Sequence, residues 1–575
     1  MNARRVLRGT PASEGVAIGP AYLYRPEKPP VPRYTVPDPE AEVQRFQTAV
    51  KEASEQLRAI HAKVLQETGD TETAAIFEAH QMFLDDPMLI DSTVERIRSQ
   101  RINAEAALAD TIEEVAAMFD ALEDEYLRAR GADLRDVGER ILRILAGIGG
   151  ASLADLVEPS IVVARDLTPS DTAQMDRSRV LGFCTAMGGP TSHTAILARQ
   201  LGIPAVVGIG EAVMELPAGE LLAVDGSAGL VWVAPDEAGR QEFAARHAQW
   251  AAEQKRRQEA AQGLTYTADG RRVEVVANIG DVRSAAEAVR WGAEGVGLLR
   301  TEFLYLERDS MPDEEEQYQA YRQIAEALGD RPLVIRTLDI GGDKQVPYLP
   351  IGQELNPFLG WRAVRLCLGM PELFKAQIRA ILRASAGHRV FMMFPMIATV
   401  EELRNAKAMV EEAKSELRER GLEVPDVPVG IMVEVPAAVV GADILAKEAA
   451  FFSIGTNDLI QYSMAIDRTN ERVSYLYEPL HPVILRQIHQ VIQAGHAAGR
   501  WVGMCGEMAG MPEAIPILLG LGLDEFSMNA SAIPEAKALI RRMHEEPARQ
   551  LARRALECET AGEVRELVRA FLANL

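Results

Sequence analysis

Between residues 38 and 145, apolar residues recur at alternating intervals of three and four. In the first part of this segment they are Val43, Phe46, Val50, Ala53, Leu57, Ile60 and Val64. This spacing places the side chains along one narrow stripe of a helix, as in helices that pack against one another. The pattern predicts a bundle of antiparallel helices. The segment has no cluster with metal-ligand spacing and no glycine-rich phosphate loop, which favours a role in packing and in presenting a surface.

The segments on either side of it, residues 1–25 and 150–232, show a different pattern. Short apolar runs such as SIVVARDL and LLAVDGSAGLVWV are separated by glycine, proline and aspartate, which is typical of strands and turns. One helix is expected near residues 192–201. We predict a small α/β domain, discontinuous in sequence, with a helical domain of residues 33–147 inserted into it. The charged helical pattern of residues 233–262 is interpreted as a linker helix.

From residue 263 onward, apolar strands alternate with helical segments. The strand candidates are residues 272–279, 295–300, 333–340, 390–397, 429–436, 451–458, 501–508 and 525–530. Eight such strands separated by helices are typical of a (β/α)₈ barrel, here over residues 263–575. The predicted fold class is therefore a multidomain α/β protein with a C-terminal TIM-type barrel.

Composition narrows the possible partners. With 84 acidic and 61 basic residues, the formal net charge is −23. Binding to nucleic acid needs a basic face, so we expect no nucleic-acid partner. An acidic surface would suit a basic protein partner.

The four cysteines are far apart and form no CxxC pair, which fits a reducing compartment. The first residues lack the apolar core of a secretory signal, and no apolar stretch reaches the roughly 18 residues needed to span a bilayer. We expect no membrane insertion and a cytoplasmic location.

The predicted strand ends carry residues suited to anion chemistry, and in this kind of barrel the reacting groups lie where the strands end. These residues are Arg300, Arg336, Glu434, Asn457, Asp458 and Cys505, with Arg468 just past the sixth strand. Arginine forks bind phosphate and carboxylate groups, and two carboxylates completed by substrate oxygens and water suit Mg²⁺. We predict an anion site with a divalent cation at the barrel mouth. The alternative for each arginine is a structural ion pair at the rim.

The α/β domain contains the segment GGPTSH at residues 188–193, followed by a helical pattern. Thr191 or Ser192 can cap that helix, which places His193 in its first turn. A helix N-terminus has free N–H groups and the positive end of the helix dipole, so an imidazole there is less readily protonated and an attached anion is stabilised. These properties suit a histidine that accepts a phosphoryl group and passes it on. The alternative is a structural histidine.

Six segments together resemble the family of enzymes that use phosphoenolpyruvate. GGPTSHTAILAR is similar to its phosphohistidine signature and FFSIGTNDLIQYSMAIDR to its barrel signature, and the others are GLLRTEFLYL, LVIRTLDIGGDK, GIMVEVPAA and GMCGEMAG. Within that family, the insert with IFEAHQMFLDDP and EYLRARGADLRDVGERIL resembles the Enzyme I branch of the phosphotransferase system. The resemblance covers essentially the whole chain in family order. One departure is Pro190, where many relatives have a basic residue.

The resemblance implies a role for each candidate. It implies that Glu434 and Asp458 hold Mg²⁺, and that phosphoenolpyruvate is bound by Arg300, Arg336, Asn457, Asp458 and Arg468. His193 would attack phosphorus and become a phosphohistidine on Nε2, and pyruvate enolate would leave. Cys505 is the candidate proton donor, since a thiol with an ordinary pKa of about 8.5 is mostly protonated at neutral pH. The alternative for Cys505 is a small core residue.

The resemblance also implies a protein acceptor, the histidine phosphocarrier protein HPr, which would dock on the helical insert. The candidate docking residues are Met82, Phe83 and Leu89, and their alternative is the core of the bundle. Because His193 and the barrel site lie in separate domains, the α/β domain is expected to swivel between the barrel mouth and the insert. A homodimer through the barrel domain is implied as well.

Two other functions stay open at this point. A relative of phosphoenolpyruvate synthase or pyruvate phosphate dikinase would phosphorylate a nucleotide and would need an ATP-binding domain. The first 150 residues, with their small strands and helical bundle, argue against such a domain. A non-catalytic paralogue would only bind a partner, and the complete set of candidate residues argues against that.

Overall fold

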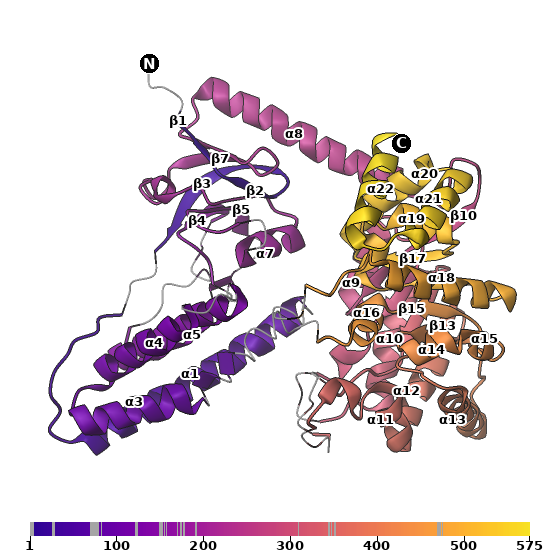
Figure 1. The fold of residues 1–575 in the computed structure, drawn as a ribbon, viewed down its shortest axis with the longest axis horizontal. Helices are drawn as coiled ribbons and strands as arrows, with labels where there is room; N and C mark the ends of the chain where they lie inside the picture. Colours follow the sequence, from indigo (N-terminus) through magenta and orange to yellow (C-terminus); the bar gives the residue numbers. More distant parts are fainter. Residues whose placement is uncertain are drawn as a thin grey trace. The chain divides into compact units, whose positions relative to one another are not determined.

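The computed structural model describes residues 5–25, 29–68, 80–81, 83–84, 86–120, 125–148, 153, 156, 158–168, 171–172, 175, 179–189, 192–306, 308, 310–342, 346, 348–349, 352, 354–467, 473 and 475–575. The chain divides into two compact units, Met1–Gln254 and Lys255–Leu575 (Figure 1). The first unit holds a β-sheet and a set of long helices, and the second holds a barrel.

The sheet of the first unit has the strand order β1-β8-β7-β3-β4-β5-β6-β2. Its strands are β1 (Arg5–Arg8), β2 (Thr10–Ser13), β3 (Val16–Tyr24), β4 (Ser160–Ala164), β5 (Val180–Thr185), β6 (Ala205–Val207), β7 (Leu221–Asp225) and β8 (Leu230–Val233). Strands β3 and β4 are parallel neighbours although the helical segment separates them in sequence. Helix α7 (His193–Leu201) contributes buried residues such as Ala195 and Ala198 to the core on one face of the sheet.

The inserted segment forms long helices that pack on one another (Figure 1). They are α1 (Pro39–Thr68), α3 (Pro87–Gln100), α4 (Ala104–Asp120) and α5 (Glu125–Ala146). Residues at the predicted helical spacing, Phe46, Ala53 and Leu57, are fully buried in their common core. Helix α3 begins where Asp86 accepts a hydrogen bond from the main-chain N–H of Met88, with Pro87 in the first helical position.

Helix α8 (Glu237–Ala260) follows β8 and is polar over most of its length. In the first unit, Phe243 of this helix packs edge-on against Trp232 with ring centroids 4.4 Å apart. In the second unit, the buried amine of Lys537 donates to the carbonyls of Ala261 at 2.9 Å and Gly263 at 2.8 Å, just past the helix end.

The second unit contains the predicted barrel. Its described residues form eight parallel strands, β10 (Arg272–Ile279), β11 (Val296–Leu299), β12 (Leu333–Arg336), β13 (Val390–Phe394), β14 (Val429–Val433), β15 (Phe452–Ile454), β16 (Val502–Met504) and β17 (Glu525–Met528), preceded by the short antiparallel β9 (Thr265–Tyr266). Strand β10 pairs with both β11 and β17, which closes the barrel. The predicted (β/α)₈ fold is confirmed.

Helices cover the outside of the barrel. They are α9 (Val282–Arg290), α10 (Glu314–Leu328), α11 (Ala363–Gly369), α12 (Pro371–Ala384), α13 (Val400–Glu419), α14 (Pro436–Val440), α15 (Ala442–Leu445), α16 (Thr456–Met464), α18 (Pro482–Ala497), α19 (Ile515–Leu521), α20 (Ile533–Arg542), α21 (Glu545–Glu557) and α22 (Ala561–Ala573). Among the helices formed by the described residues, none is long and apolar enough to cross a membrane.

The barrel interior is divided into two halves of different polarity. One half is apolar and includes Leu298, Val334, Met393, Met432 and Phe451. The other half contains the polar side chains of Asn278 on β10 and of Glu525 and Ser527 on β17. Glycines make room for them there: a Cβ at residue 297 would approach Ser527 Oγ to 2.6 Å and Glu525 Oε1 to 2.7 Å, and a Cβ at residue 503 would approach Glu525 Oε1 to 2.7 Å.

Candidate active site

The structure places the candidate barrel residues at the C-terminal ends of neighbouring parallel strands. Arg336 is the last residue of β12, and three others directly follow their strands: Arg300 after β11, Glu434 after β14 and Cys505 after β16. Asn457 and Asp458 lie in the first turn of α16, shortly after β15. Because the strands are parallel and form one closed barrel, these residues share one mouth. Arg468 lies outside the described residues.

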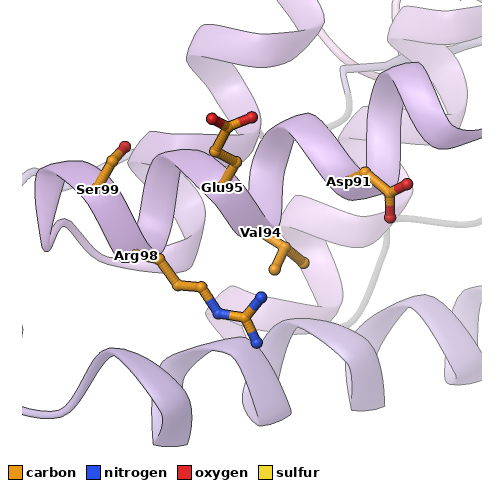
Figure 2. A pocket seen from close by; sticks show the side chains of 5 residues that line it. All are labelled: Asp91, Val94, Glu95, Arg98 and Ser99. Atoms are coloured by element: carbon orange, nitrogen blue, oxygen red, sulfur yellow. The ribbon is translucent and has the colours of Figure 1, made fainter.

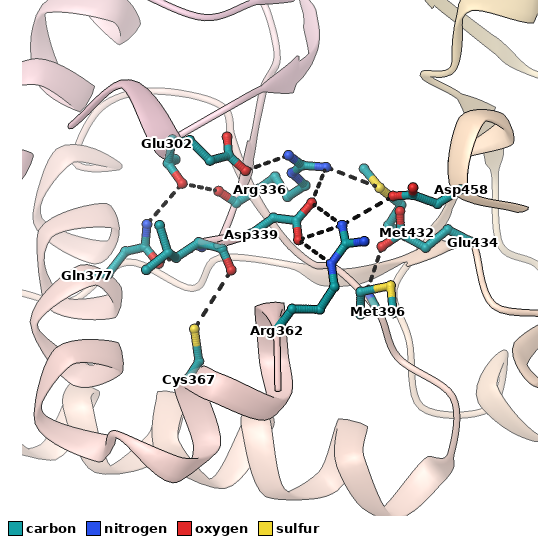
Figure 3. Close-up of polar contacts among 12 residues, drawn as sticks. Glu302, Arg336, Asp339, Arg362, Cys367, Gln377, Met396, Met432, Glu434 and Asp458 are labelled. Atoms are coloured by element: carbon teal, nitrogen blue, oxygen red, sulfur yellow. Dashed lines mark hydrogen bonds and ion pairs between the residues drawn. The ribbon is translucent and has the colours of Figure 1, made fainter. Parts of the chain in front are cut away.

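A buried network of alternating charges lies at this mouth (Figure 3). Arg336 pairs with Glu302 at 2.6 Å and with Asp339 at 3.2 Å. Arg362 pairs with Asp339 at 3.0 Å and with Asp458 at 3.4 Å. Burial alone would lower the pKa of Arg336. The negative charges of Glu302 and Asp339 outweigh this effect and raise the pKa above its ordinary value, so the guanidinium stays charged. Two buried cations are therefore held in place before any anionic ligand enters.

Glu434 lies beside this network and is almost completely buried. Burial, followed by the nearby charges of Asp458 and Asp339, raises the pKa of Glu434 to about 8. Its Oε1 accepts a hydrogen bond from the main-chain N–H of Met396 at 2.6 Å. Acidic groups forced together in a buried site are a favourable setting for a divalent cation, whose charge offsets their repulsion.

The donor set fits a cation that also takes ligands from elsewhere. Among the residues that the structure describes, no three His, Cys, Asp or Glu side chains are grouped so as to hold a metal ion. Glu434 and Asp458 offer carboxylate oxygens only, the donor type that Mg²⁺ prefers, and Mg²⁺ commonly takes one or two carboxylates together with substrate oxygens and water. The chemistry of these two residues therefore fits Mg²⁺.

Cys505 is only 4% exposed and lines the barrel interior. Burial raises the pKa of its thiol to about 11. At neutral pH the sulfur therefore carries its proton, which a general acid requires and a nucleophilic cysteine does not.

Asn457 connects two loops at the mouth. Its Nδ2 donates to Glu507 Oε1 at 3.0 Å, and its Oδ1 accepts from the main-chain N–H of Glu507 at 3.2 Å and from the hydroxyl of Tyr477 at 3.2 Å. Arg300, by contrast, is exposed. The two residues are thus available to a ligand in different ways: Arg300 is free to reorient, and Asn457 would have to exchange partners.

His193 is the first residue of α7, as the sequence pattern predicts. The Ser192 side chain caps this helix by accepting a hydrogen bond from the main-chain N–H of Ala195 at 3.4 Å. Gly188 turns the preceding loop with φ of 99°, a conformation that favours glycine. The His193 side chain, Pro190 and Thr191 lie outside the described part of the chain. The helix start supplies the N–H groups and dipole that would stabilise a phosphoryl group on that histidine.

The structure adds three residues that the sequence reasoning did not assign to the site: Glu302, Asp339 and Arg362. Glu302 and Asp339 lie within the segments GLLRTEFLYL and LVIRTLDIGGDK, where a charged residue just past a buried strand is a usable signal. Arg362 gives no such signal, because it lies directly before helix α11 and does not follow a strand.

The candidate docking residues on the helical insert separate into different environments. Leu89 is 1% exposed and belongs to the core of the bundle, so it acts in packing and is not part of a docking surface. Phe83 is partly buried against the same core. Met82 lies outside the described residues. Nearby on α3 is a shallow hollow lined by Asp91, Val94, Glu95, Arg98 and Ser99 (Figure 2).

Comparison with known proteins identifies the family. The chain matches three models of PEP-utilising enzymes. The model of the PEP-binding domain matches residues 253–545, the N-terminal model matches residues 8–130, and the model of the mobile domain matches residues 156–229. The phosphoenolpyruvate-protein phosphotransferase of Staphylococcus carnosus (strain TM300) is 46% identical over 99% of both chains. This chain belongs to the phosphoenolpyruvate–protein phosphotransferase family.

Two further proteins are similar to this chain, one over nearly its whole length and one over part of it. The phosphoenolpyruvate-protein phosphotransferase of Geobacillus stearothermophilus is 48% identical over 98% of both chains. A solved structure titled as an NMR solution structure of Enzyme I (nEIt) is 44% identical and covers 43% of this chain and 99% of its own, with a TM-score of 0.39. Membership in the family makes the chain a transferase that carries out phosphotransfer from phosphoenolpyruvate.

Proposed function

We propose that this enzyme transfers the phosphoryl group of phosphoenolpyruvate to His193 and from there to the histidine phosphocarrier protein HPr, with release of pyruvate. This is the first step of the sugar phosphotransferase system, and we place it in the cytoplasm. The observation that carries the proposal is the buried Arg336–Asp339–Arg362–Asp458 network beside Glu434 at the barrel mouth. It combines fixed positive charge for an anion with carboxylates for a divalent cation.

Substrate binding is the role of the barrel mouth. The phosphate and carboxylate groups would be held by Arg300, Arg336, Arg468 and Asn457. We add Arg362 to these proposed ligands, because it lies against Asp339 and Asp458 at the same mouth. Glu434 and Asp458 would hold Mg²⁺, which when bound neutralises negative charge on the substrate oxygens. Because Arg336 is already fixed by its ion pairs, little reorganisation is needed when charge develops as the P–O bond breaks.

The phosphoryl group would move to the imidazole of His193. The nitrogen attacks phosphorus in line with the leaving enolate oxygen, and the arginines stabilise the charge on the transferring group. His193 belongs to the first unit and the barrel site to the second, so transfer requires the α/β domain to approach the barrel mouth. We propose that this domain swivels.

Cys505 would then protonate the enolate. Its buried thiol carries a proton at neutral pH, and it follows β16 at the same mouth as Arg336 and Glu434. Protonation at carbon converts the enolate to pyruvate, which is then released.

The helical insert would bind the acceptor. Phe83 and Met82 remain the proposed contacts, and the exposed carboxylates of Asp91 and Glu95 on α3 add negative charge suited to a basic partner. A homodimer through the barrel is also proposed. Val440, Ile444 and Val483 are exposed aliphatic residues on α14, α15 and α18, helices that contact one another.

One labelling experiment tests the function against its alternatives. The enzyme is incubated with Mg²⁺ and ³²P-labelled phosphoenolpyruvate, then with the phosphocarrier protein, with AMP and phosphate (the synthase reaction), or with AMP and pyrophosphate (the dikinase reaction). We expect label on the enzyme, its transfer to the phosphocarrier, and one pyruvate per phosphoryl group. Label in ATP instead would support the dikinase alternative, and an unlabelled enzyme would support a non-catalytic paralogue.

A further inference from the structure

Inside the barrel, the side chain of Asn278 reaches from β10 across β17 to β16. Its Nδ2 donates to the main-chain carbonyl of Cys505 at 2.9 Å, although β17 lies between these two strands in the sheet. The alternation along β10 explains this direction. Its neighbours Ala277 and Ile279 belong to the core outside the barrel, so residue 278 is directed inward.

Ser527 on the intervening strand fixes the orientation of that amide. Ser527 is completely buried, and its Oγ donates to Asn278 Oδ1 at 2.6 Å. Since the amide oxygen accepts this bond, the amide nitrogen must face the carbonyl of Cys505. The three residues therefore form one directed chain, from the hydroxyl to the amide to the main chain of Cys505.

The pairing of strand β16 with strand β17 does not hold the main chain of Cys505. The pairing of β16 with β17 ends at Met504 and Phe526, so Cys505 lies one residue past the ladder. On the β15 side, its main-chain N–H donates to the carbonyl of Ile454 at 3.1 Å. Asn278 holds the carbonyl of the same residue. Together these contacts fix the two peptide groups on either side of the Cys505 Cα, and hence the direction in which the side chain leaves the backbone.

We infer that Asn278 and Ser527 are positioning residues that hold the Cys505 thiol on one face of the pyruvate enolate. This inference rests on the proposed function of Cys505. In the step concerned, the enolate oxygen reforms the C2 carbonyl, and the electron pair of the C2–C3 double bond takes the proton to C3. The S–H bond breaks with its electron pair left on sulfur. The thiolate then regains a proton from solvent, so no oxidant or reductant is involved.

The test uses phosphoenolpyruvate carrying deuterium and tritium at C3, turned over in ordinary water by the full-length enzyme with Mg²⁺ and the phosphocarrier. Proton delivery from one face gives a chiral methyl group, whereas delivery from solvent gives both configurations. The stereochemical result does not depend on which step limits the rate. The variants are Ser527→Ala, which removes one donor, and Asn278→Asp, which keeps the acceptor for Ser527 and removes the Nδ2 donor.

Ser385→Ala is the matched control, because Ser385 is also a buried serine of the barrel unit whose Oγ donates over 2.6 Å, in its case to the carbonyl of Leu382. We expect both test variants to give largely stereorandom pyruvate. Misplacement of a catalytic group should lower kcat by about 10- to 100-fold with KM for phosphoenolpyruvate changed by less than about threefold. The control should keep wild-type stereospecificity.

Cys505→Ala, measured in parallel, separates the two levels of the proposal. If Cys505→Ala gives stereospecific pyruvate, Cys505 is not the proton donor, and the positioning role fails with it. If Cys505→Ala gives stereorandom pyruvate while folded Ser527→Ala and Asn278→Asp stay stereospecific, the donor is correct and only the positioning role is overturned. Because Ser527→Ala removes a single oxygen atom, it keeps the inference testable if Asn278→Asp does not fold.

Discussion

The main-chain N–H of Met396 donates to Oε1 of Glu434 over 2.6 Å, and Met396 makes this contact from a left-handed backbone conformation with φ of 57°. For a residue with a Cβ, that conformation costs about 1–2 kcal/mol. Such strain is retained where the surrounding structure fixes a particular geometry, commonly at functional sites. Glu434 is thus held by a strained turn at the same time as Asp458 and Asp339 disfavour its negative charge.

Glu434→Gln is therefore expected to raise stability and abolish function. Glutamine keeps the oxygen that accepts from Met396 but removes the charge that is unfavourable beside Asp458. In metal-free buffer at pH 8, we expect a higher Tm than wild type by calorimetry. Turnover of phosphoenolpyruvate should fall by about 10²-fold or more, as for loss of a group that places charge stabilisation in the site.

Glu302→Gln provides the contrast for that variant. Glu302 is also buried, but it is paired with Arg336 at 2.6 Å, so removing its charge should lower Tm. A Tm for Glu434→Gln below that of wild type in metal-free buffer would show that the Glu434 carboxylate is not destabilising.

Gln377 is expected to support the reaction because it connects the segments that follow β11 and β12, the two strands whose ends carry Arg300 and Arg336. Its Oε1 accepts from the main-chain N–H of Leu338 at 2.9 Å, and its Nε2 donates to Thr301 Oγ1 at 3.1 Å (Figure 3). Thr301 in turn donates to the carbonyl of Arg336 at 3.0 Å. Gln377→Leu should lower kcat/KM for phosphoenolpyruvate by about tenfold, since small displacements of positioned groups have effects of this size.

The control for this effect is Gln317→Leu. Gln317 is an equally buried amide that accepts from the hydroxyl of Tyr305 and donates to the carbonyl of Pro312. Within the described part of the chain, it is linked to Gln377 only through the shared hydroxyl of Tyr321, and it makes no hydrogen bond to Thr301 or Leu338 at the strand ends. Both variants should lose about 1–3 kcal/mol of stability in urea unfolding, because each leaves buried polar groups without partners. Equal loss of kcat/KM in the two variants would assign the effect to general destabilisation.

Glu525 should make the stability of the barrel depend on pH. Burial raises the pKa of this carboxyl, which lies inside the barrel, to about 8 from its ordinary value of 4.5. The folded state therefore keeps its proton between pH 4.5 and 8, whereas the unfolded state loses it. The favourable contribution is complete below pH 4.5 and is lost as pH rises toward 8, by about 1.4 kcal/mol per pH unit.

Glu525→Gln removes this titration. We expect the variant to differ little from wild type near pH 4.5 and to be increasingly more stable than wild type up to pH 8, as measured by urea unfolding at several pH values. A stability difference between the two proteins that stays constant with pH would mean that Glu525 ionises normally in the fold.

His193→Ala should separate phosphorylation from substrate binding. The variant is expected to take up no label from ³²P-phosphoenolpyruvate, because no imidazole is left at the start of α7. Binding of phosphoenolpyruvate and Mg²⁺ by the barrel, measured by calorimetry, should be within about twofold of wild type, since sites in separate units act additively. His247→Ala, an exposed histidine on α8, is the control and should be labelled normally. Loss of binding together with labelling in folded His193→Ala would contradict the separation.

The sequence predicts each of the eight barrel strands but extends most of them too far at the C-terminal end. Residues 333–340 were expected to form one strand, and β12 ends at Arg336. Leu338 and Ile340, beyond that end, are as buried as the strand itself. Hydrophobic patterning reports burial, and in this barrel the loops that carry the site are also buried, so the pattern continues past the last ladder pair.

The individual strand-end residues could be found from sequence, but their pairing could not. Arg362 approaches Asp339 and Asp458 only because the chain after β12 returns to the mouth before α11, and no periodicity encodes that course. In the same way, helical spacing marks both Phe83 and Leu89 as apolar positions without showing that Leu89 is in the core. Such distinctions depend on which helix face meets a neighbour.

The strand order of the first unit has a consequence for how the chain folds as it is made. Each pair that β1, β2 and β3 form in the described sheet is with β8, β6, β7 or β4, all of which follow the helical insert. The N-terminal strands therefore leave the ribosome before any of their partners exist. The helices of the insert contact one another and can form in the meantime, because local contacts assemble first. A nascent chain whose residues up to about 150 have left the ribosome should thus contain a folded helical bundle whose N-terminal strands are still accessible to proteases and chaperones.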